Sequence, residues 1–224
     1  IEQTLSHLMA KFRFDYWVIC DTGSSDDTPR IVCDFFKKAK IPGELHSHPW
    51  VDFGHNRSRA LEVAYDKADY VFIFDADDEL CGTPVLPDPL DLDAYHMSFG
   101  GGFCYRRLAL LNNRKKWHYV GVLHEILLPK EDIGATGDIQ GDYYCVSGKT
   151  GARNRDPKKY HKDAAILEKA YLEQENLAPW LRQRYAFYCA QSYKDAEEWD
   201  KSIEWYEKRI QLGGWNQELY VSHT

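Results

Sequence analysis

Hydrophobic residues in the first part of the chain follow two alternating patterns. Residues 1–13 carry apolar side chains at the spacing of an amphipathic helix, and residues 16–20, YWVIC, form an uninterrupted apolar run of strand length. A polar loop follows, and the pair Thr28-Pro29 is typical of the start of a helix. The pattern therefore predicts a helix, a buried strand, a polar loop and a second helix.

The same order recurs further along the chain. Residues 55–68 have the pattern of another amphipathic helix, and residues 70–74, YVFIF, form a second fully apolar strand. Apolar strands that alternate with helices indicate an α/β fold, with a largely parallel sheet covered by helices on both faces. Ligands bind at the carboxyl ends of the strands in such sheets. Asp21 and the acidic residues 75–79 lie at two of these predicted ends.

The pattern changes twice in the second half of the chain. Residues 82–148 consist of short, aromatic-rich segments, which predict strands and loops that belong to the same domain. From residue 156 onward the pattern is helical. We therefore expect one domain at residues 1–151 and a helical tail at residues 152–224.

Within the tail, residues 181–213 have the spacing of one tetratricopeptide unit. Its small and aromatic positions are Ala190, Tyr193, Ser202 and Tyr206. One unit cannot bury both of its faces, so we expect it to pack on the preceding domain, on a helix at residues 158–175 or on further repeats. It serves either as packing support or as a docking surface for a protein partner.

Composition and charge narrow the class of protein. The 224 residues include 28 Lys and Arg against 35 Asp and Glu, which gives a net charge of −7. Such a balance disfavours binding to nucleic acid or anionic membranes without a local basic patch, and we identify none in the sequence. The apolar runs fall short of the roughly 20 residues that span a bilayer, so we expect no transmembrane segment.

The six cysteines form no C-x-x-C pair and have no regular spacing. This argues against a zinc site or a disulfide framework and favours a reducing compartment, from which we expect a cytoplasmic protein. Ile1 falls within the first helical pattern. We therefore expect the chain to begin inside a domain.

The strongest chemical signal is the segment FDADDE, in which a predicted strand ends in Asp75 and Asp77. Carboxylate oxygens at the end of a strand can bind Mg²⁺ or Mn²⁺, because these cations prefer oxygen ligands and keep positions open for phosphate. The alternative is a solvated acidic turn.

A second signal follows the first strand, where Asp21 precedes a Gly-Ser-Ser loop. Asp21 can accept a hydrogen bond from a nucleotide base or a ribose hydroxyl, and the glycine lets a ligand approach the backbone. Alternatively, Asp26 or Asp27 caps the helix that begins near Pro29. Both interpretations can hold together.

Four segments in this order resemble family 2 glycosyltransferases of the GT-A fold. FGHNRSRALEVA (53–64) is similar to the Arg-Asn-x-Ala-Leu helix of that family, with Arg57 at the arginine position and Ser58 where asparagine is usual. FDADDEL resembles the metal-binding D-x-D strand end. Residues 105–127 resemble a segment in which Arg-Leu is followed by Trp, Gly and His-Glu, and the tail resembles the tetratricopeptide-type tail of one subgroup.

The resemblance implies a GT-A-type, Rossmann-like sheet, mixed but mostly parallel, whose first strand lies upstream of Ile1. It implies a nucleotide-sugar donor, with UDP expected, a Mn²⁺ or Mg²⁺ ion, and an acceptor that is a glycan, a protein or a lipid-linked molecule. Asp21 would contact the uracil or ribose, and Arg57 the base or diphosphate. Asp77 would ligate the metal, and Asp75 the ribose or a metal-bound water.

The pair His124-Glu125 is the candidate for proton transfer. Transfer with inversion needs a base that takes the proton of the acceptor hydroxyl, and a carboxylate suits this role. We assign it to Glu125, with His124 as a ligand of the metal or diphosphate. The alternative is structural, with His124 packed against Trp117 and Glu125 paired with Arg106 or Arg107.

Residues 147–153, SGKTGAR, form a glycine-rich basic loop without the spacing of a Walker motif. Lys149 and Arg153 either close over a bound diphosphate as part of a lid or belong to a linker that leads to the tail.

Two other function classes compete with a glycosyltransferase. The first is a non-catalytic scaffold, in which a degenerate transferase domain carries a tetratricopeptide module. The second is a nucleotidyltransferase or a metal-dependent phosphohydrolase on a similar sheet. Nucleotide binding with and without Mn²⁺ discriminates among these classes.

Overall fold

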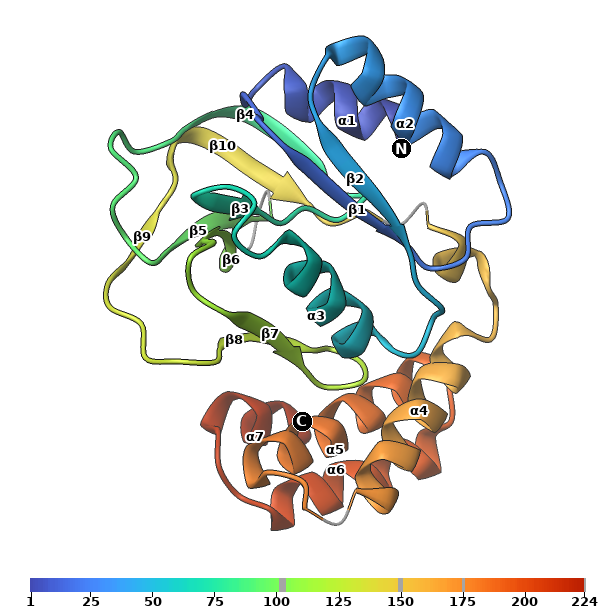
Figure 1. Cartoon of the computed structure of the whole chain (residues 1–224). Helices are drawn as coiled ribbons and strands as arrows, with labels where there is room; N and C mark the ends of the chain where they lie inside the picture. Colours follow the sequence, from blue (N-terminus) through green and yellow to red (C-terminus); the bar gives the residue numbers. More distant parts are fainter. Residues whose placement is uncertain (101–103, 149–150, 175, 224) are drawn as a thin grey trace. The chain divides into compact units, whose positions relative to one another are not determined.

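The computed structural model describes residues 1–100, 104–148, 151–174 and 176–223 (Figure 1). The chain forms two compact units, and each combines segments that are distant in the sequence. The first unit comprises Ile1–Val51, His55–Val120 and Leu127–Gly151, and the second comprises Asp52–Gly54, Gly121–Ile126 and Ala152–Thr224. The second unit therefore contains the helical tail and two short segments from the first 151 residues.

The first unit begins with two helices and two strands. They are α1 (Glu2–Met9), β1 (Trp17–Asp21), α2 (Thr28–Ala39) and β2 (Gly43–Ser47). The strands β1 and β2 pair in parallel, and Trp17 of β1 stacks on Phe36 of α2 with 4.6 Å between ring centroids. The predicted helix, strand and helix are confirmed here, whereas β2 had no signal in the hydrophobic pattern.

A six-stranded sheet follows, in the order β3-β6-β5-β10-β4, with β9 beside β5. The helix before it and its strands are α3 (Phe53–Ala64), β3 (Tyr70–Phe72), β4 (Glu79–Val85), β5 (Ala94–Phe99), β6 (Tyr105–Asn112), β9 (Thr136–Asp138) and β10 (Gln140–Val146). The pairs β3–β6, β5–β6 and β4–β10 are antiparallel, and β5 pairs in parallel with β9 and β10.

The predicted α/β class is confirmed, but the sheet is mixed rather than mostly parallel. Between residues 82 and 148 the described residues contain no helix. Consecutive strands that are joined by a short connection, such as β5 and β6, pair in antiparallel fashion, whereas β5 meets its parallel partners β9 and β10 only after a long connection that contains β6, β7 and β8.

Neighbouring residues of β6 point to opposite faces of the sheet, as the two-residue repeat of a strand requires. Leu110 packs in one hydrophobic cluster with Leu8 and Phe12, which follow or belong to α1. Leu111 packs in another cluster with Leu61 of α3. Helical residues therefore contribute to the core on both faces of the sheet.

Two short strands, β7 (Trp117–Val120) and β8 (Ile126–Pro129), form a separate two-stranded sheet. The backbone N–H of Lys130 donates to the carbonyl oxygen of Lys116 at 2.8 Å, which continues this pairing at its open end. The connection at residues 121–125 belongs to the second unit.

The second unit is helical in the tail. Its elements there are the short 3₁₀ helix η1 (Ala152–Arg155) and the helices α4 (Lys159–Glu173), α5 (Pro179–Asp195), α6 (Trp199–Gln211) and α7 (Asn216–His223). The expected helical character of the tail is confirmed. Ala190 and Ser202 are buried where the two helices meet, and the Ser202 hydroxyl donates to the Ala190 carbonyl at 3.0 Å.

α4 covers another side of α5, so the helix expected at residues 158–175 does pack against the tetratricopeptide-like segment. The Tyr193 hydroxyl donates to Glu168 of α4 at 2.7 Å. Arg209 and Glu218, both buried, form an ion pair at 2.9 Å that joins α6 and α7.

The six cysteines all lie among the described residues, and they form no disulfide bonds with one another. Among the described residues, no helix is both long and apolar enough to cross a membrane.

Candidate functional site

The chain forms a tight turn at the four residues Asp75 to Asp78, shortly after β3. We call this segment the acidic turn. The backbone N–H of Asp78 donates to the Asp75 carbonyl at 3.1 Å, and the Thr4 hydroxyl of α1 donates to the Ala76 carbonyl at 2.7 Å. Ile73, just before the turn, donates its N–H to Ala109 of β6 at 2.7 Å. The sheet and α1 therefore hold the turn at the carboxyl end of β3.

Two arginines hold the Asp75 carboxylate. Arg57 of α3 lies 2.6 Å from one oxygen, and Arg107 of β6 lies 3.6 Å from the other. The side chains of Arg57 and Asp75 are about three-quarters buried, with 24% and 26% exposed. The structure thus brings together Arg57 and Asp75, two of the predicted site residues, and it adds Arg107, which the sequence did not indicate for this site.

Asp78 is the third carboxylate of the turn and the most buried, with 5% of its side chain exposed. Burial, followed by repulsion from Asp75, raises its pKa to about 6, against the opposing effect of a hydrogen bond from the Gly148 N–H at 3.1 Å. Arg107 lies 3.9 Å away. Asp78 was missed because its contact with Gly148 joins residues that are 70 positions apart in the sequence.

Asp77 lies against the two described ends of the glycine-rich loop. A Cβ at Gly148 would overlap the carbonyl group of Asp77 and lie 2.9 Å from its Cβ, so only glycine fits there without a backbone shift. A Cβ at Gly151 would lie 3.3 Å from a carboxylate oxygen of Asp77. Lys149 lies outside the described residues.

The donor set of the turn suits a cation that takes its other ligands from a substrate. Among the described residues, no group of three or more His, Cys, Asp and Glu is arranged to hold a metal ion. Mg²⁺, however, is commonly bound by one or two carboxylates together with substrate phosphates. A cation at Asp77 would also offset the carboxylate repulsion that raises the pKa of Asp78.

Asp21 is the last residue of β1, and its carboxylate organises the loop that follows. It accepts hydrogen bonds from the backbone N–H groups of Gly23 at 3.1 Å and Ser24 at 3.2 Å. A hydrogen bond from the Ser24 side chain, with further backbone hydrogen bonds, lowers the pKa of Asp21. Asp26 accepts the Thr28 N–H at 3.0 Å, so Asp26 is the aspartate that caps the start of α2 through its side chain.

Contacts at the two ends of α3 show where the end of β1 lies relative to the acidic turn. Lys67, just beyond the end of α3, pairs with Glu44 near the start of β2, and its ammonium lies 5.9 Å from the ring of Tyr16, just before β1. Arg57, near the start of α3, pairs with Asp75. α3 therefore runs opposite to β1, and both Asp21 and the acidic turn lie toward the end where α3 begins.

His124 and Glu125 lie in the second unit, in the loop between β7 and β8. α5 holds this loop. The Val122 N–H donates to the Tyr185 hydroxyl at 3.0 Å, and the Arg184 guanidinium donates to the His124 carbonyl at 2.7 Å. His124 has a φ of 53°, an uncommon conformation for a residue other than glycine that points to a constrained loop.

The His124 ring stacks on Tyr188 of α5, with 3.9 Å between centroids. The residue as a whole is exposed, although the stacking on Tyr188 covers one face of the imidazole and partly desolvates it. This desolvation, followed by the charges of Arg184, Arg153 and Lys159, lowers the pKa of His124 to about 4. A neutral imidazole can accept a hydrogen bond or ligate a metal at neutral pH.

The structural alternative placed His124 against Trp117 and paired Glu125 with Arg106 or Arg107. The structure describes other partners for His124 and for both arginines. The described stacking partner of His124 is Tyr188 of its own unit. Arg106 pairs with Asp138 at 2.6 Å, and Arg107 lies at the acidic turn.

Arg153 belongs to the second unit, where it pairs with Asp163 and lies over the ring of Phe53 at 4.7 Å.

Comparison with protein-family models gives no match for this chain. Comparison with curated proteins gives no match either. The geometry of the two units is therefore the basis for a functional proposal.

Proposed function

We propose that this chain is a metal-dependent glycosyltransferase that moves a sugar from a nucleotide-diphosphate donor to an acceptor hydroxyl. We expect the donor to be a UDP-sugar. The acidic turn carries the proposal. Two of its three carboxylates, those of Asp75 and Asp78, are held by Arg57, Arg107 and the Gly148 amide at the carboxyl end of a strand. Several buried negative charges lower the stability of the fold. A cation bound beside them, with a diphosphate as its other ligand, would offset that loss, and this supports a metal and diphosphate site.

In this proposal Asp77 ligates a Mn²⁺ or Mg²⁺ ion, with Asp75 on the donor ribose or on a metal-bound water. When bound, the metal supplies charge that stabilises the diphosphate leaving group. Asp75 also positions Arg57, whose guanidinium contacts the base or diphosphate. Asp21 contacts the uracil or ribose at the end of β1.

Glu125 is the proposed base. The bond between the anomeric carbon and the diphosphate oxygen breaks, the acceptor oxygen bonds to that carbon from the opposite side, and the acceptor proton passes to Glu125. The products are an inverted glycoside and UDP. His124, neutral at pH 7, is a candidate ligand for the metal or diphosphate.

The first experiment is isothermal titration of the protein with UDP and with GDP, each with and without Mn²⁺. We expect UDP to bind in the presence of Mn²⁺ and Asp77→Asn to abolish the metal dependence. The matched control is Asp142→Asn, which removes an exposed carboxylate on β10. Failure of both nucleotides to bind would favour the scaffold interpretation.

The second experiment is product analysis by NMR with a UDP-sugar and an acceptor. An inverted anomeric configuration supports the mechanism, and a retained one contradicts it. Condensation of a nucleoside triphosphate with a sugar phosphate would identify a nucleotidyltransferase instead, and release of inorganic phosphate a phosphohydrolase.

A further inference from the structure

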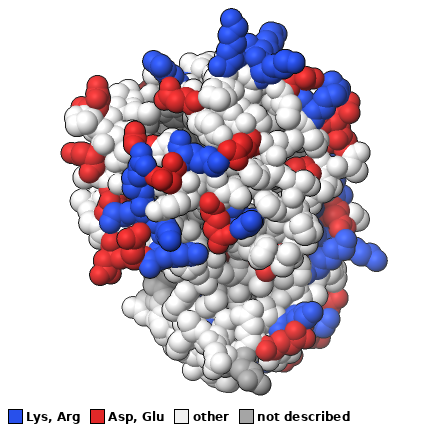
Figure 2. Space-filling view, in the orientation of Figure 1, with Lys and Arg blue, Asp and Glu red and all other residues white. Residues whose placement is uncertain are grey.

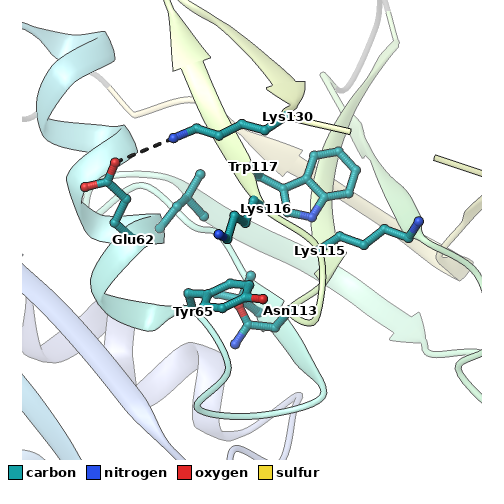
Figure 3. A pocket seen from close by; sticks show the side chains of 9 residues that line it. Glu62, Tyr65, Asn113, Lys115, Lys116, Trp117 and Lys130 are labelled. Carbon is teal, nitrogen blue, oxygen red and sulfur yellow. Dashed lines mark ion pairs between the residues drawn. The ribbon is translucent and has the colours of Figure 1, made fainter. Parts of the chain in front are cut away.

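The first unit contains a pocket of about 220 Å³ whose chemistry differs from that of the acidic turn. α3 contributes Glu62, and Tyr65 follows the last residue of α3 (Figure 3). The β7–β8 hairpin with the turn before it contributes Lys116, Trp117 and Lys130. Lys and Arg side chains gather, with Asp and Glu between them, where the surface covers β7 and β8 (Figure 2). The pocket is therefore a local basic site on an acidic protein.

The β7–β8 hairpin makes Lys116 and Lys130 neighbours. The backbone N–H of Lys130 donates to the carbonyl of Lys116, so the two residues are cross-strand neighbours. Both side chains point toward α3 in Figure 3. Like charges at directly opposed positions of two strands destabilise the pairing. An anion between the two ammonium groups would remove that repulsion.

Neither ammonium group is neutralised by a close carboxylate. The Lys130 ammonium is 3.7 Å from Glu62, with both side chains more than 40% exposed, so the pair is weak. Glu62 already has a closer partner in Arg59, at 3.0 Å. Among the described residues, Lys116 forms no ion pair, and its ammonium lies 5.6 Å from the centre of the Tyr65 ring.

Lys115 also lines the pocket but is oriented differently. Its ammonium points away from α3 in Figure 3 and lies 3.5 Å from the Asp93 carboxylate. A substitution of Lys115 changes the charge as much as one of Lys116 but leaves both inward-pointing ammonium groups in place. Lys115 is therefore a matched control.

The pocket lies at the other end of α3 from the proposed donor site. Arg57, which pairs with Asp75, and Ala64, the last residue of α3, are seven residues apart, or about 10 Å along a helix that rises 1.5 Å per residue, and Tyr65 of the pocket follows Ala64. The pocket and the acidic turn therefore use different residues and different charges.

We propose that this pocket binds a phosphate monoester no larger than a monosaccharide phosphate. The phosphate sits between the ammonium groups of Lys116 and Lys130, because lysine binds phosphate as a point charge. The body of the ligand rests against the Tyr65 ring and the apolar side chains of Leu61 and Val71. At about 220 Å³ the pocket is smaller than sites for drug-sized ligands, which measure roughly 300–1,000 Å³.

The test is isothermal titration of the full chain with glucose 6-phosphate, glucuronate and glucose. We expect glucose 6-phosphate to bind and glucose not to bind. Lys116→Gln and Lys130→Gln should each weaken binding about tenfold, the loss expected for one charge-assisted contact. Lys115→Gln should leave the affinity unchanged.

Further results separate this site from the donor site and from general charge attraction. Binding of glucose 6-phosphate that persists in Asp77→Asn and in the presence of UDP with Mn²⁺ supports a distinct site, whether or not the transferase proposal holds. Displacement by UDP with Mn²⁺, equal weakening by Lys115→Gln, or equal affinity for glucuronate would overturn the proposal. Absence of glucose 6-phosphate binding to the unmodified chain would overturn it as well.

Discussion

Gly148 of the glycine-rich loop contacts two aspartates of the acidic turn, Asp77 and Asp78. The space that its missing side chain leaves is taken by the backbone of Asp77, and its N–H donates to Asp78. The residue therefore couples the end of β10 to the acidic turn, although 70 residues separate Gly148 from Asp78 in the chain. A side chain at this position would force either the loop or the turn to move.

Gly148→Ala should lower the free energy of unfolding by about 1–3 kcal/mol, the range typical of overpacking. It should also weaken Mn²⁺-dependent UDP binding, because the acidic turn would shift. Urea denaturation and isothermal titration measure the two effects. The control is Gly134→Ala, whose new Cβ would approach only a side-chain oxygen of Asp93, at 3.2 Å; equal losses in both variants would contradict the role of Gly148.

A second prediction at the residue scale concerns pH. Glu44 accepts hydrogen bonds from Lys67, from the Tyr16 hydroxyl at 2.6 Å and from His46 at 2.8 Å. These bonds, with that from Lys67 first, lower the pKa of Glu44 from 4.5 to about 2. Because the folded pKa lies below the unfolded value, the stabilisation is complete above pH 4.5 and is lost as the pH falls toward 2.

Glu44→Gln should therefore destabilise the protein at pH 7, and the difference from the unmodified chain should shrink between pH 4.5 and pH 2. Urea denaturation at several pH values measures this. Glu207→Gln, at an exposed position of α6, serves as the control. A difference that stays constant with pH would show that ionisation of Glu44 is not its cause.

At this scale the sequence predicted part of the site. Asp21, Asp75 and Asp77 could be placed because each comes directly after, or within a few residues of, an apolar run. Arg107 and Asp78 could not be assigned to the site, since their roles depend on β6 and on Gly148. Lys116 and Lys130 are 14 residues apart, and only the hairpin makes them neighbours.

Among the elements, helices were predicted better than strands. Their apolar spacing spans several turns, as in α2, where Val32 and Phe36 are buried. β2 and β4 gave little signal, because GELHS contains charged and polar residues and ELCGTPV carries glycine and proline. The direction of each strand depends on its connections, so strand pattern alone did not reveal the antiparallel pairs.

The contact of α5 with α6 supports a prediction at the element scale. Ala190 is fully buried, and its carbonyl accepts the Ser202 hydroxyl. Ala190→Leu should cost about 1–3 kcal/mol, since the added carbons have no space between the helices. Ala165→Leu, at an exposed position of α4, should cost little. Thermal or urea unfolding compares the two, and similar losses would contradict the tight packing.

For the whole molecule, the two units divide the proposed chemistry. The acidic turn belongs to the first unit, and Glu125 belongs to the second. We therefore expect Glu125→Gln to lower kcat by about 10²–10⁴, the usual contribution of a general base, while UDP binding stays unchanged. Asp77→Asn should weaken UDP binding in the presence of Mn²⁺.

Steady-state kinetics together with isothermal titration of both variants tests this division. Unchanged turnover in Glu125→Gln would exclude Glu125 as the base. Weakened UDP binding in the same variant would show that Glu125 helps to bind the donor and that the chemistry is not divided between the units.

The composition of the second unit has a consequence for how the protein is made. The loop of His124 and Glu125 is synthesised 60 residues before Arg184, which binds the His124 carbonyl. At about 5–20 residues per second, the ribosome needs roughly 3–12 s to bridge that interval. The acidic turn and Gly148 have both been synthesised by then. A nascent chain would accordingly gain the residues of the proposed nucleotide site first, and only the completed α5 would order the loop that carries the proposed base.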